Sequence, residues 1–171
     1  MHNNIVLIGF MGTGKSSVGL KLATRLKRDF VDMDREIENV SGMSINEIFR
    51  RYGERRFRSE ESLMAKKLSQ RRNLVVATGG GLVLVPENIA ALRQNGVIVL
   101  LEARAEDIWA RVNRKRGTRP MLKGAASVAD IQKLLDHRAD YYDCADIRVN
   151  TSDKELDTVI REILQQLEPL S

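Results

Sequence analysis

Gly9-Phe-Met-Gly-Thr-Gly-Lys-Ser-Ser17 is the stretch that decides the fold, because it contains the pattern G-x-x-x-x-G-K-S. The apolar run at residues 5–8 precedes it and predicts a buried strand, and a helical pattern of apolar residues follows it. A glycine-rich turn between a strand and a helix lets backbone amides surround a phosphate group. Lys15 can then reach the β- and γ-phosphates, and the Ser16 hydroxyl can ligate Mg²⁺. The stretch therefore predicts a nucleotide-phosphate loop.

The bulk composition predicts one globular domain, residues 1–171, with an aliphatic core. The net charge of +5 suits either nucleic acid or an anionic small substrate. A single cysteine, Cys144, excludes a disulfide within the chain and fits a reducing compartment. The sequence shows neither signal-peptide features nor an apolar run near the ~20 residues of a membrane span. We therefore expect a cytoplasmic protein without a membrane partner.

Strands alternate with helices along the chain. Continuous aliphatic strands in this alternation predict a three-layer α/β/α fold, with a parallel sheet covered on both faces. Ser44, Ser127 and Ser152 are each followed three residues later by Glu or Asp, which predicts capped helix starts. The expected strands lie at 4–8, 30–32, 74–78, 97–101 and 147–149, and the expected helices at 15–27, 35–40, 44–52, 54–71, 86–94, 105–114 and 127–142, with a last helix after Ser152.

Ligands of parallel sheets gather at the carboxyl ends of the strands. Asp32 and Asp34 follow the second expected strand, beside the predicted phosphate loop. One carboxylate can hold Mg²⁺ through its water shell, and the other can accept a proton from a substrate hydroxyl. Alternatively, Asp34 caps the helix that begins at Arg35. Gly79–Gly81 ends the third strand and indicates a close approach by a ligand or by another part of the backbone.

The arginines divide into several groups. Arg55 and Arg56 fit a solvated helix face, whereas Arg58 follows the buried Phe57 and can lie at a pocket rim. From the residues alone, Arg138 is a surface arginine. The basic loop from Arg114 to Pro120 can bind nucleic acid, although it lacks aromatic residues for base stacking. On a phosphate-loop protein it more sharply predicts a mobile lid that brings Arg119 to the transferring phosphate.

Together these residues resemble the shikimate kinase family over essentially the whole chain. The resemblance rests on an ordered set of motifs: the phosphate loop at 9–17, Asp32-x-Asp34, Gly53-Glu54-x-x-Phe57-Arg58-x-x-Glu61, Thr78-Gly-Gly-Gly81, Arg119-Pro120 and Arg138-x-x-x-Tyr142. It implies a P-loop kinase fold with a five-stranded parallel sheet in order 2-3-1-4-5. The implied reaction is transfer of the γ-phosphoryl group of ATP to the 3-hydroxyl of shikimate.

The resemblance also implies roles for individual residues. Asp34 contacts the ring hydroxyls as the candidate base, and Arg58 and Arg138 clamp the shikimate carboxylate. The substrate-binding region is about 33–61 and the lid about 112–125. The remaining implied contacts are the substrate loop Gly79, Gly80 and Gly81; the phosphate-binding residues Gly12, Thr13, Gly14, Lys15, Ser16 and Ser17; Mg²⁺ at Ser16 and, through water, at Asp32; Arg119 on ATP; and Arg111 on adenine.

Two other functions remain open at this point. A gluconate or nucleotide kinase would share the fold. The feature that distinguishes a shikimate kinase from these two is the carboxylate clamp of Arg58 and Arg138. A basic ATPase that binds nucleic acid would use the 115–119 loop. We expect a monomer that takes shikimate and ATP. We expect no binding of nucleic acid, because two anionic substrates already explain the positive net charge. The adenine contacts near residues 151–154 are not evident from the sequence.

Overall fold

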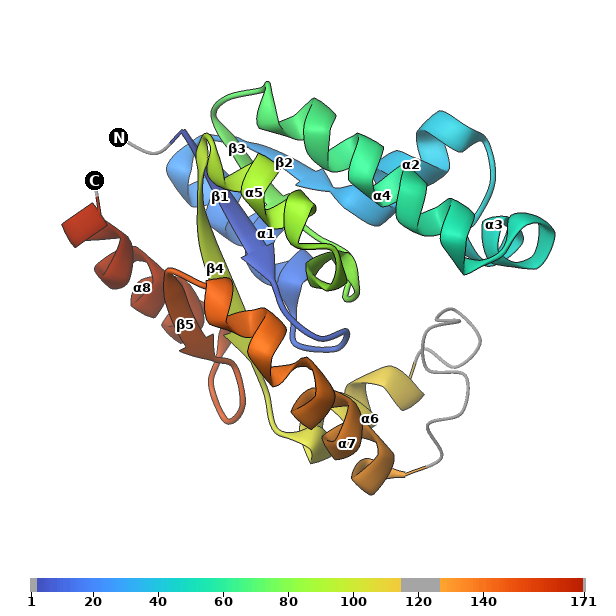
Figure 1. The fold of residues 1–171 in the computed structure, drawn as a ribbon. Coiled ribbons are helices and arrows are strands. Elements are labelled where there is room, and N and C mark those ends of the chain that lie inside the picture. Colours follow the sequence, from blue (N-terminus) through green and yellow to red (C-terminus); the bar gives the residue numbers. More distant parts are fainter. Residues whose placement is uncertain (1–2, 115–126, 171) are drawn as a thin grey trace.

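A computed structural model describes residues 3–114 and 127–170 of the chain. Within these residues five parallel strands form one sheet in the order β2-β3-β1-β4-β5, as the family resemblance implied (Figure 1). The strands are β1 (Asn4–Ile8), β2 (Asp29–Asp32), β3 (Leu74–Ala77), β4 (Gly96–Glu102) and β5 (Ile147–Asn150).

Helices pack on both faces of this sheet and at its carboxyl end. The helices are α1 (Lys15–Leu26), α2 (Met33–Ser41), α3 (Ile45–Tyr52), α4 (Glu54–Ser69), α5 (Pro86–Arg93), α6 (Ala105–Asn113), α7 (Val128–Arg138) and α8 (Leu156–Leu167). Figure 1 shows α6 and α7 beyond the carboxyl ends of the strands. There Phe10 and Met11, which follow β1 after Gly9, share a small apolar cluster with Ile108 and Ile131.

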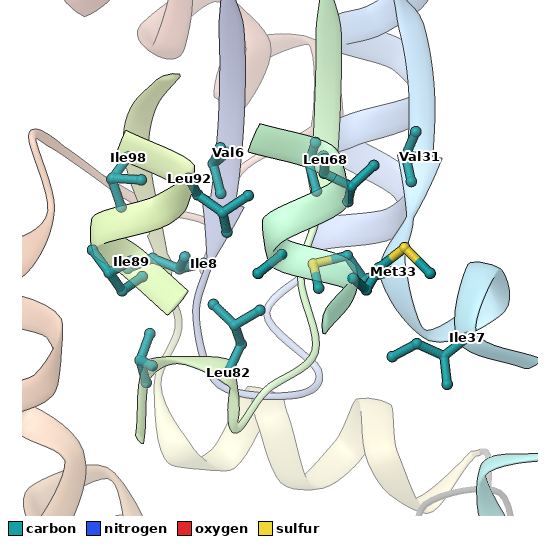
Figure 2. Close-up of a cluster of buried hydrophobic side chains, with 14 of the residues drawn as sticks. Val6, Ile8, Val31, Met33, Ile37, Leu68, Leu82, Ile89, Leu92 and Ile98 are labelled. Carbon is teal, nitrogen blue, oxygen red and sulfur yellow. The ribbon is translucent and has the colours of Figure 1, made fainter. Parts of the chain in front are cut away.

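The central strand β1 divides the two main cores, because successive strand residues point to opposite faces. Val6 and Ile8 join the cluster under α2, α4 and α5, part of which Figure 2 shows. Ile5 and Leu7 join the cluster under α1 and α8. All five β1 residues are buried, which explains why four of them, residues 5–8, form a continuous apolar run.

Two of the three expected serine caps are confirmed. The Ser44 side chain accepts a hydrogen bond from the Glu47 amide, and the Ser127 side chain accepts one from the Asp130 amide. The expected cap at Ser152 is wrong, because α8 begins after Glu155 and the Ser152 hydroxyl instead accepts from the Arg104 amide at 2.9 Å. Short-range spacing could not reveal that distant partner.

The helix expected over 127–142 is shorter than predicted. It ends as α7 at Arg138 and continues as a 3₁₀ helix over Ala139–Cys144. This tighter segment buries Tyr142 in the cluster that also contains Leu82. In the part of the chain that the structure describes, no helix combines the length and apolarity needed to cross a membrane.

Candidate active site

The phosphate loop joins β1 to α1, and its path depends on glycine. Gly9, Gly12 and Gly14 have positive φ angles of 147°, 80° and 99°, in a region that other residues rarely adopt. A Cβ atom on Gly9 would also overlap the Leu101 carbonyl of β4. Gly14 occupies the N-cap position of α1, so the loop delivers the chain directly to a helix N-terminus. Its amides and the helix dipole suit an anion.

Lys15 is the first residue of α1 and folds back over the loop. Its ammonium donates hydrogen bonds to the Gly9 carbonyl at 2.7 Å and to the Phe10 carbonyl at 2.9 Å. The Thr13 hydroxyl donates to the same Phe10 carbonyl at 2.8 Å. The loop therefore already holds a buried cation at the place where the motif predicts phosphate oxygens.

Ser16 and Asp32 form the oxygen pair expected at a magnesium site. The Ser16 hydroxyl donates to Asp32 Oδ2 at 2.8 Å. In the described residues no cluster of three or more His, Cys, Asp or Glu side chains could hold a metal ion. A hydroxyl and one carboxylate nevertheless fit Mg²⁺, which keeps several waters and takes substrate phosphate oxygens as ligands.

The helix-capping alternative for Asp34 is wrong, because α2 begins at Met33 and its cap is Asp32. The Asp32 side chain accepts from the Arg35 amide at 3.4 Å. Asp34 lies in the first turn of α2, and its Oδ1 atom faces the backbone of Gly79. The register explains this proximity, because Asp32 pairs with Ala77 at the ends of the adjacent strands β2 and β3.

Each of the three glycines after β3 lies close to different neighbouring residues. A Cβ atom on Gly79 would lie 2.7 Å from Glu61 Oε2 and 2.9 Å from Asp34 Oδ1. On Gly80 it would lie 3.2 Å from the Met11 amide of the phosphate loop. On Gly81 it would overlap the Arg58 guanidinium. The turn therefore has close neighbours on several sides, as three consecutive glycines predicted.

Two guanidinium groups converge on this glycine turn. Arg58 packs against Gly81, and its side chain is only 13% exposed. Arg138 donates from its NH1 group to the Gly80 carbonyl at 3.0 Å, and its guanidinium lies 5.1 Å from the centre of the Phe10 ring. The residues alone had favoured a surface position for Arg138, but tertiary contacts bring it to the site.

Arg56 follows the solvated-face interpretation, since it pairs with Glu60 on the surface of α4 at 3.0 Å. Arg55 is exposed on the same helix. The structure thus separates the three arginines of this segment as the helical spacing predicted, with Arg58 alone turned toward the glycine turn.

Glu61 is a site residue to which the sequence assigned no role. Its side chain is 1% exposed, and Oε1 accepts from Arg58 NH1 at 2.6 Å. Oε2 accepts no hydrogen bond from the described residues and faces Gly79. Burial raises the pKa of this carboxyl from 4.5 to about 7, against the lowering effect of Arg58, and the nearby Asp34 adds to the rise. Its signal in the sequence was its place three residues after Arg58.

Arg111 and Thr151 reach the phosphate loop from the far side. Arg111 NH1 donates to the Gly12 carbonyl at 3.0 Å and to the Thr151 hydroxyl at 3.3 Å. Lys154, near the unassigned adenine contacts, pairs with Glu162 at 2.9 Å. Arg119 and most of the predicted lid lie outside the described residues.

A phosphate loop on the central strand of a 2-3-1-4-5 sheet, with a cation, a hydroxyl–carboxylate pair and two guanidinium groups at the adjoining glycine turn, defines a P-loop kinase. Residues 11–168 match the model of one such family, described as shikimate kinase. The chain belongs to the shikimate kinase family.

Similar proteins support this membership over nearly the whole chain. Shikimate kinase of Pelotomaculum thermopropionicum is 49% identical over 164 residues, covering 96% of this chain and 95% of that protein. Shikimate kinase of Desulforudis audaxviator is 50% identical over 164 residues, covering 96% of this chain and 86% of that protein. The structure of shikimate kinase from Acinetobacter baumannii in complex with shikimate superposes with a TM-score of 0.92 at 35% identity, covering 99% of this chain and 94% of that one.

A gluconokinase from Sinorhizobium meliloti has a TM-score of 0.60 at 19% identity, covering 99% of this chain and 93% of that one. At that identity the likeness concerns the fold alone. The fold is therefore common to kinases with different acceptors, and the acceptor has to be argued from the residues around the glycine turn.

Proposed function

We propose that this chain transfers the γ-phosphoryl group of ATP to the 3-hydroxyl of shikimate, with Mg²⁺ as the metal ion. The bond between the substrate oxygen and the γ-phosphorus forms while the bond to the β-phosphate oxygen breaks, and ADP leaves. The hydroxyl proton passes to Asp34. Catalysis of this kind depends mostly on positioning and on charge neutralisation.

On the donor side, Gly12 to Ser17 surround the ATP phosphates through backbone amides and hydroxyls. Lys15 leaves the loop carbonyls that it contacts here and neutralises the β- and γ-phosphates. Ser16 and, through water, Asp32 would hold Mg²⁺, which would supply charge neutralisation at the phosphate oxygens. From the lid, about 112–125, Arg119 would add a further positive charge.

On the acceptor side, the substrate-binding region is about 33–61 together with the glycine turn. Arg58 and Arg138 bind the substrate carboxylate, because planar guanidinium groups match a carboxylate with two parallel hydrogen bonds. The Gly80 amide contacts the substrate, and Gly79 and Gly81 shape the turn. Asp34 binds the ring hydroxyls from the end of α2 that faces this turn.

One observation carries the choice of acceptor. Two guanidinium groups and one carboxylate, on Arg58, Arg138 and Asp34, come from three different helices to a single glycine turn. That turn touches the phosphate loop at Met11. An acceptor with a carboxylate at one end and hydroxyls at the other matches this distribution of charge, whereas a nucleoside monophosphate would present a phosphate dianion. Gluconate also carries a carboxylate and hydroxyls, and membership of the shikimate kinase family favours shikimate over it.

Steady-state assays test the proposal directly. ADP release would be measured with Mg²⁺, ATP and one acceptor at a time: shikimate, gluconate or a nucleoside monophosphate. We expect turnover with shikimate that exceeds turnover with the other acceptors by several orders of magnitude. Absence of turnover with shikimate would overturn the assignment.

Asp34→Asn should keep shikimate binding and lose most of kcat, because the amide cannot accept the proton.

We further propose that the chain works as a monomer in the cytoplasm and binds no nucleic acid. Both substrates are anions, so the positive net charge needs no polyanionic partner. Sedimentation at micromolar concentration should give the mass of one chain. Titration with RNA and DNA at physiological salt should show no binding, and a salt-dependent affinity that tracks the 115–119 loop would contradict the proposal.

A further inference from the structure

The carbonyl groups of the phosphate loop are held by side chains from three regions of the chain. Lys15 binds the Gly9 and Phe10 carbonyls, as described above. The Gly12 and Thr13 carbonyls accept hydrogen bonds from α6 and from the residue after β5. These two partners, Arg111 and Thr151, lie far from the loop in sequence.

Thr151 occupies a position that only the folded chain creates. It directly follows β5, is 5% exposed, and its amide donates to the Glu102 carbonyl at the end of β4. Its hydroxyl oxygen lies 3.0 Å from the Thr13 carbonyl oxygen and 3.0 Å from the Glu102 carbonyl oxygen. A hydroxyl has a single hydrogen to share between these acceptors, and its lone pairs can accept from Arg111 at 3.3 Å.

The orientation of the Gly12 and Thr13 carbonyls matters for anion binding. A peptide group carries a partly positive N–H and a partly negative C=O at opposite ends, so turning one toward an anion turns the other away. The Thr13 carbonyl shares its peptide group with the Gly14 amide, so the Thr151 hydrogen bond keeps that amide available on the other side. The Gly12 carbonyl shares its peptide group with the Thr13 amide, which donates to the Phe10 carbonyl at 3.3 Å, so the Arg111 hydrogen bond fixes the turn of the loop itself. An unheld carbonyl rotated toward the phosphate would repel it.

We propose that Arg111 and Thr151 together form a brace that fixes the phosphate loop in its anion-binding conformation, and that Thr151 is thereby a positioning residue for ATP. The inference rests on the proposed function and deepens it. The brace requires Thr151 for its hydroxyl and not for contact with the base. In this proposal Arg111 supports the loop backbone through its hydrogen bond to the Gly12 carbonyl, and this role is separate from any stacking on adenine.

Thr151→Val tests the brace, because valine keeps the shape and removes the hydroxyl. Dissociation constants would be measured by calorimetry for ADP, whose β-phosphate the loop binds, and for AMP, which lacks that phosphate. We expect ADP binding to weaken about three- to tenfold, the factor for one lost hydrogen bond, and AMP binding to change less than twofold. Thr151→Ser should restore ADP binding.

Thr24→Val is the matched control, since Thr24 is exposed on α1 and its hydroxyl donates to the Leu20 carbonyl within the same helix. It should leave both dissociation constants unchanged. Equal weakening of ADP and AMP in Thr151→Val would assign Thr151 to the base and overturn the brace. Unchanged ADP binding would overturn it as well.

Arg111→Met gives a second test on a half-buried side chain, should Thr151→Val fold poorly. The brace predicts a selective loss for ADP, whereas a purely adenine-stacking arginine predicts equal losses for ADP and AMP. In the double variant the two effects should not multiply, because both residues support one loop segment. These binding measurements involve no phosphoryl transfer, so their outcome is independent of the shikimate assay.

Discussion

Replacing Glu61 by glutamine should remove a pH-dependent loss of stability that the active site imposes on the fold. Glu61 is buried between Arg58, with which it pairs at 2.6 Å, and the Gly79 backbone. The nearby charges of Asp34 and Arg138 act on it in opposite directions, but burial dominates and raises the pKa of its carboxyl to about 7. Glutamine keeps an oxygen acceptor for Arg58 and does not titrate.

The magnitude follows from proton linkage. A rise of the pKa from 4.5 to about 7 on folding corresponds to roughly 3 kcal/mol, since each pKa unit is worth about 1.4 kcal/mol. Because the folded pKa is raised, the folded chain binds the proton more tightly than the unfolded chain. The resulting stability is fully present below pH 4.5 and is lost as the pH rises through 7. Between pH 5 and pH 8 the loss amounts to about 2–3 kcal/mol.

Urea unfolding at pH 5, 6, 7 and 8, at constant ionic strength and without substrates, measures this quantity. The free energy of unfolding of Glu61→Gln minus that of the unmodified chain should rise by about 2–3 kcal/mol across the series. Taking this difference cancels the titration of groups that both proteins share. The direction in which this free-energy difference changes with pH is therefore as informative as its size.

A difference that stays constant within about 0.5 kcal/mol from pH 5 to pH 8 would refute the reasoning, because it would mean that folding does not perturb this carboxyl. Glu60→Gln is the matched control on the same helix. Glu60 pairs with Arg56 at the surface of α4, and its replacement should change the free energy of unfolding by no more than about 0.5 kcal/mol at each pH.

Three further substitutions test separate parts of the site. Lys15→Met should abolish ADP release while the far-UV circular dichroism spectrum is retained; turnover at the unmodified rate would show that the loop is wrongly assigned. Arg138→Ala should weaken shikimate binding by roughly 2–5 kcal/mol, and an unchanged KM for shikimate would exclude Arg138, which donates to the Gly80 carbonyl, from the carboxylate clamp. Gly81→Ala should displace the Arg58 guanidinium, at a cost of about 1–3 kcal/mol in stability and with a higher KM for shikimate; wild-type values of both would contradict the close packing.

Local signals in the sequence predicted the elements well. The phosphate loop, the Ser44 and Ser127 caps and the strands were predictable because each depends on residues within a few positions of one another. Asp32, rather than Asp34, caps α2 because the helix starts two residues earlier than its apolar pattern indicated. Boundaries of this kind depend on the backbone path leaving the strand.

Local sequence patterns did not predict contacts between residues that are far apart in the chain. Thr151 joins the loop through a hydrogen bond to Thr13, 138 positions away in the chain. Arg138 reached the site through its bond to the Gly80 carbonyl, 58 positions away, and only the family resemblance had placed it there beforehand. The raised pKa of Glu61 likewise follows from its burial, which neither its charge nor its neighbours in sequence indicated.

The position of β1 in the sheet has a consequence for the growing polypeptide. This strand is made first, yet its neighbours β3 and β4 are both made much later: the Leu74 amide that bonds to the Asn4 side chain lies 70 residues further on, and Ile8 pairs with Leu100. During translation this mostly apolar strand therefore leaves the ribosome long before either pairing partner exists. A nascent chain with such an unpaired strand is a substrate for chaperones that hold exposed apolar segments, and stalled or truncated products ending before residue 74 should aggregate.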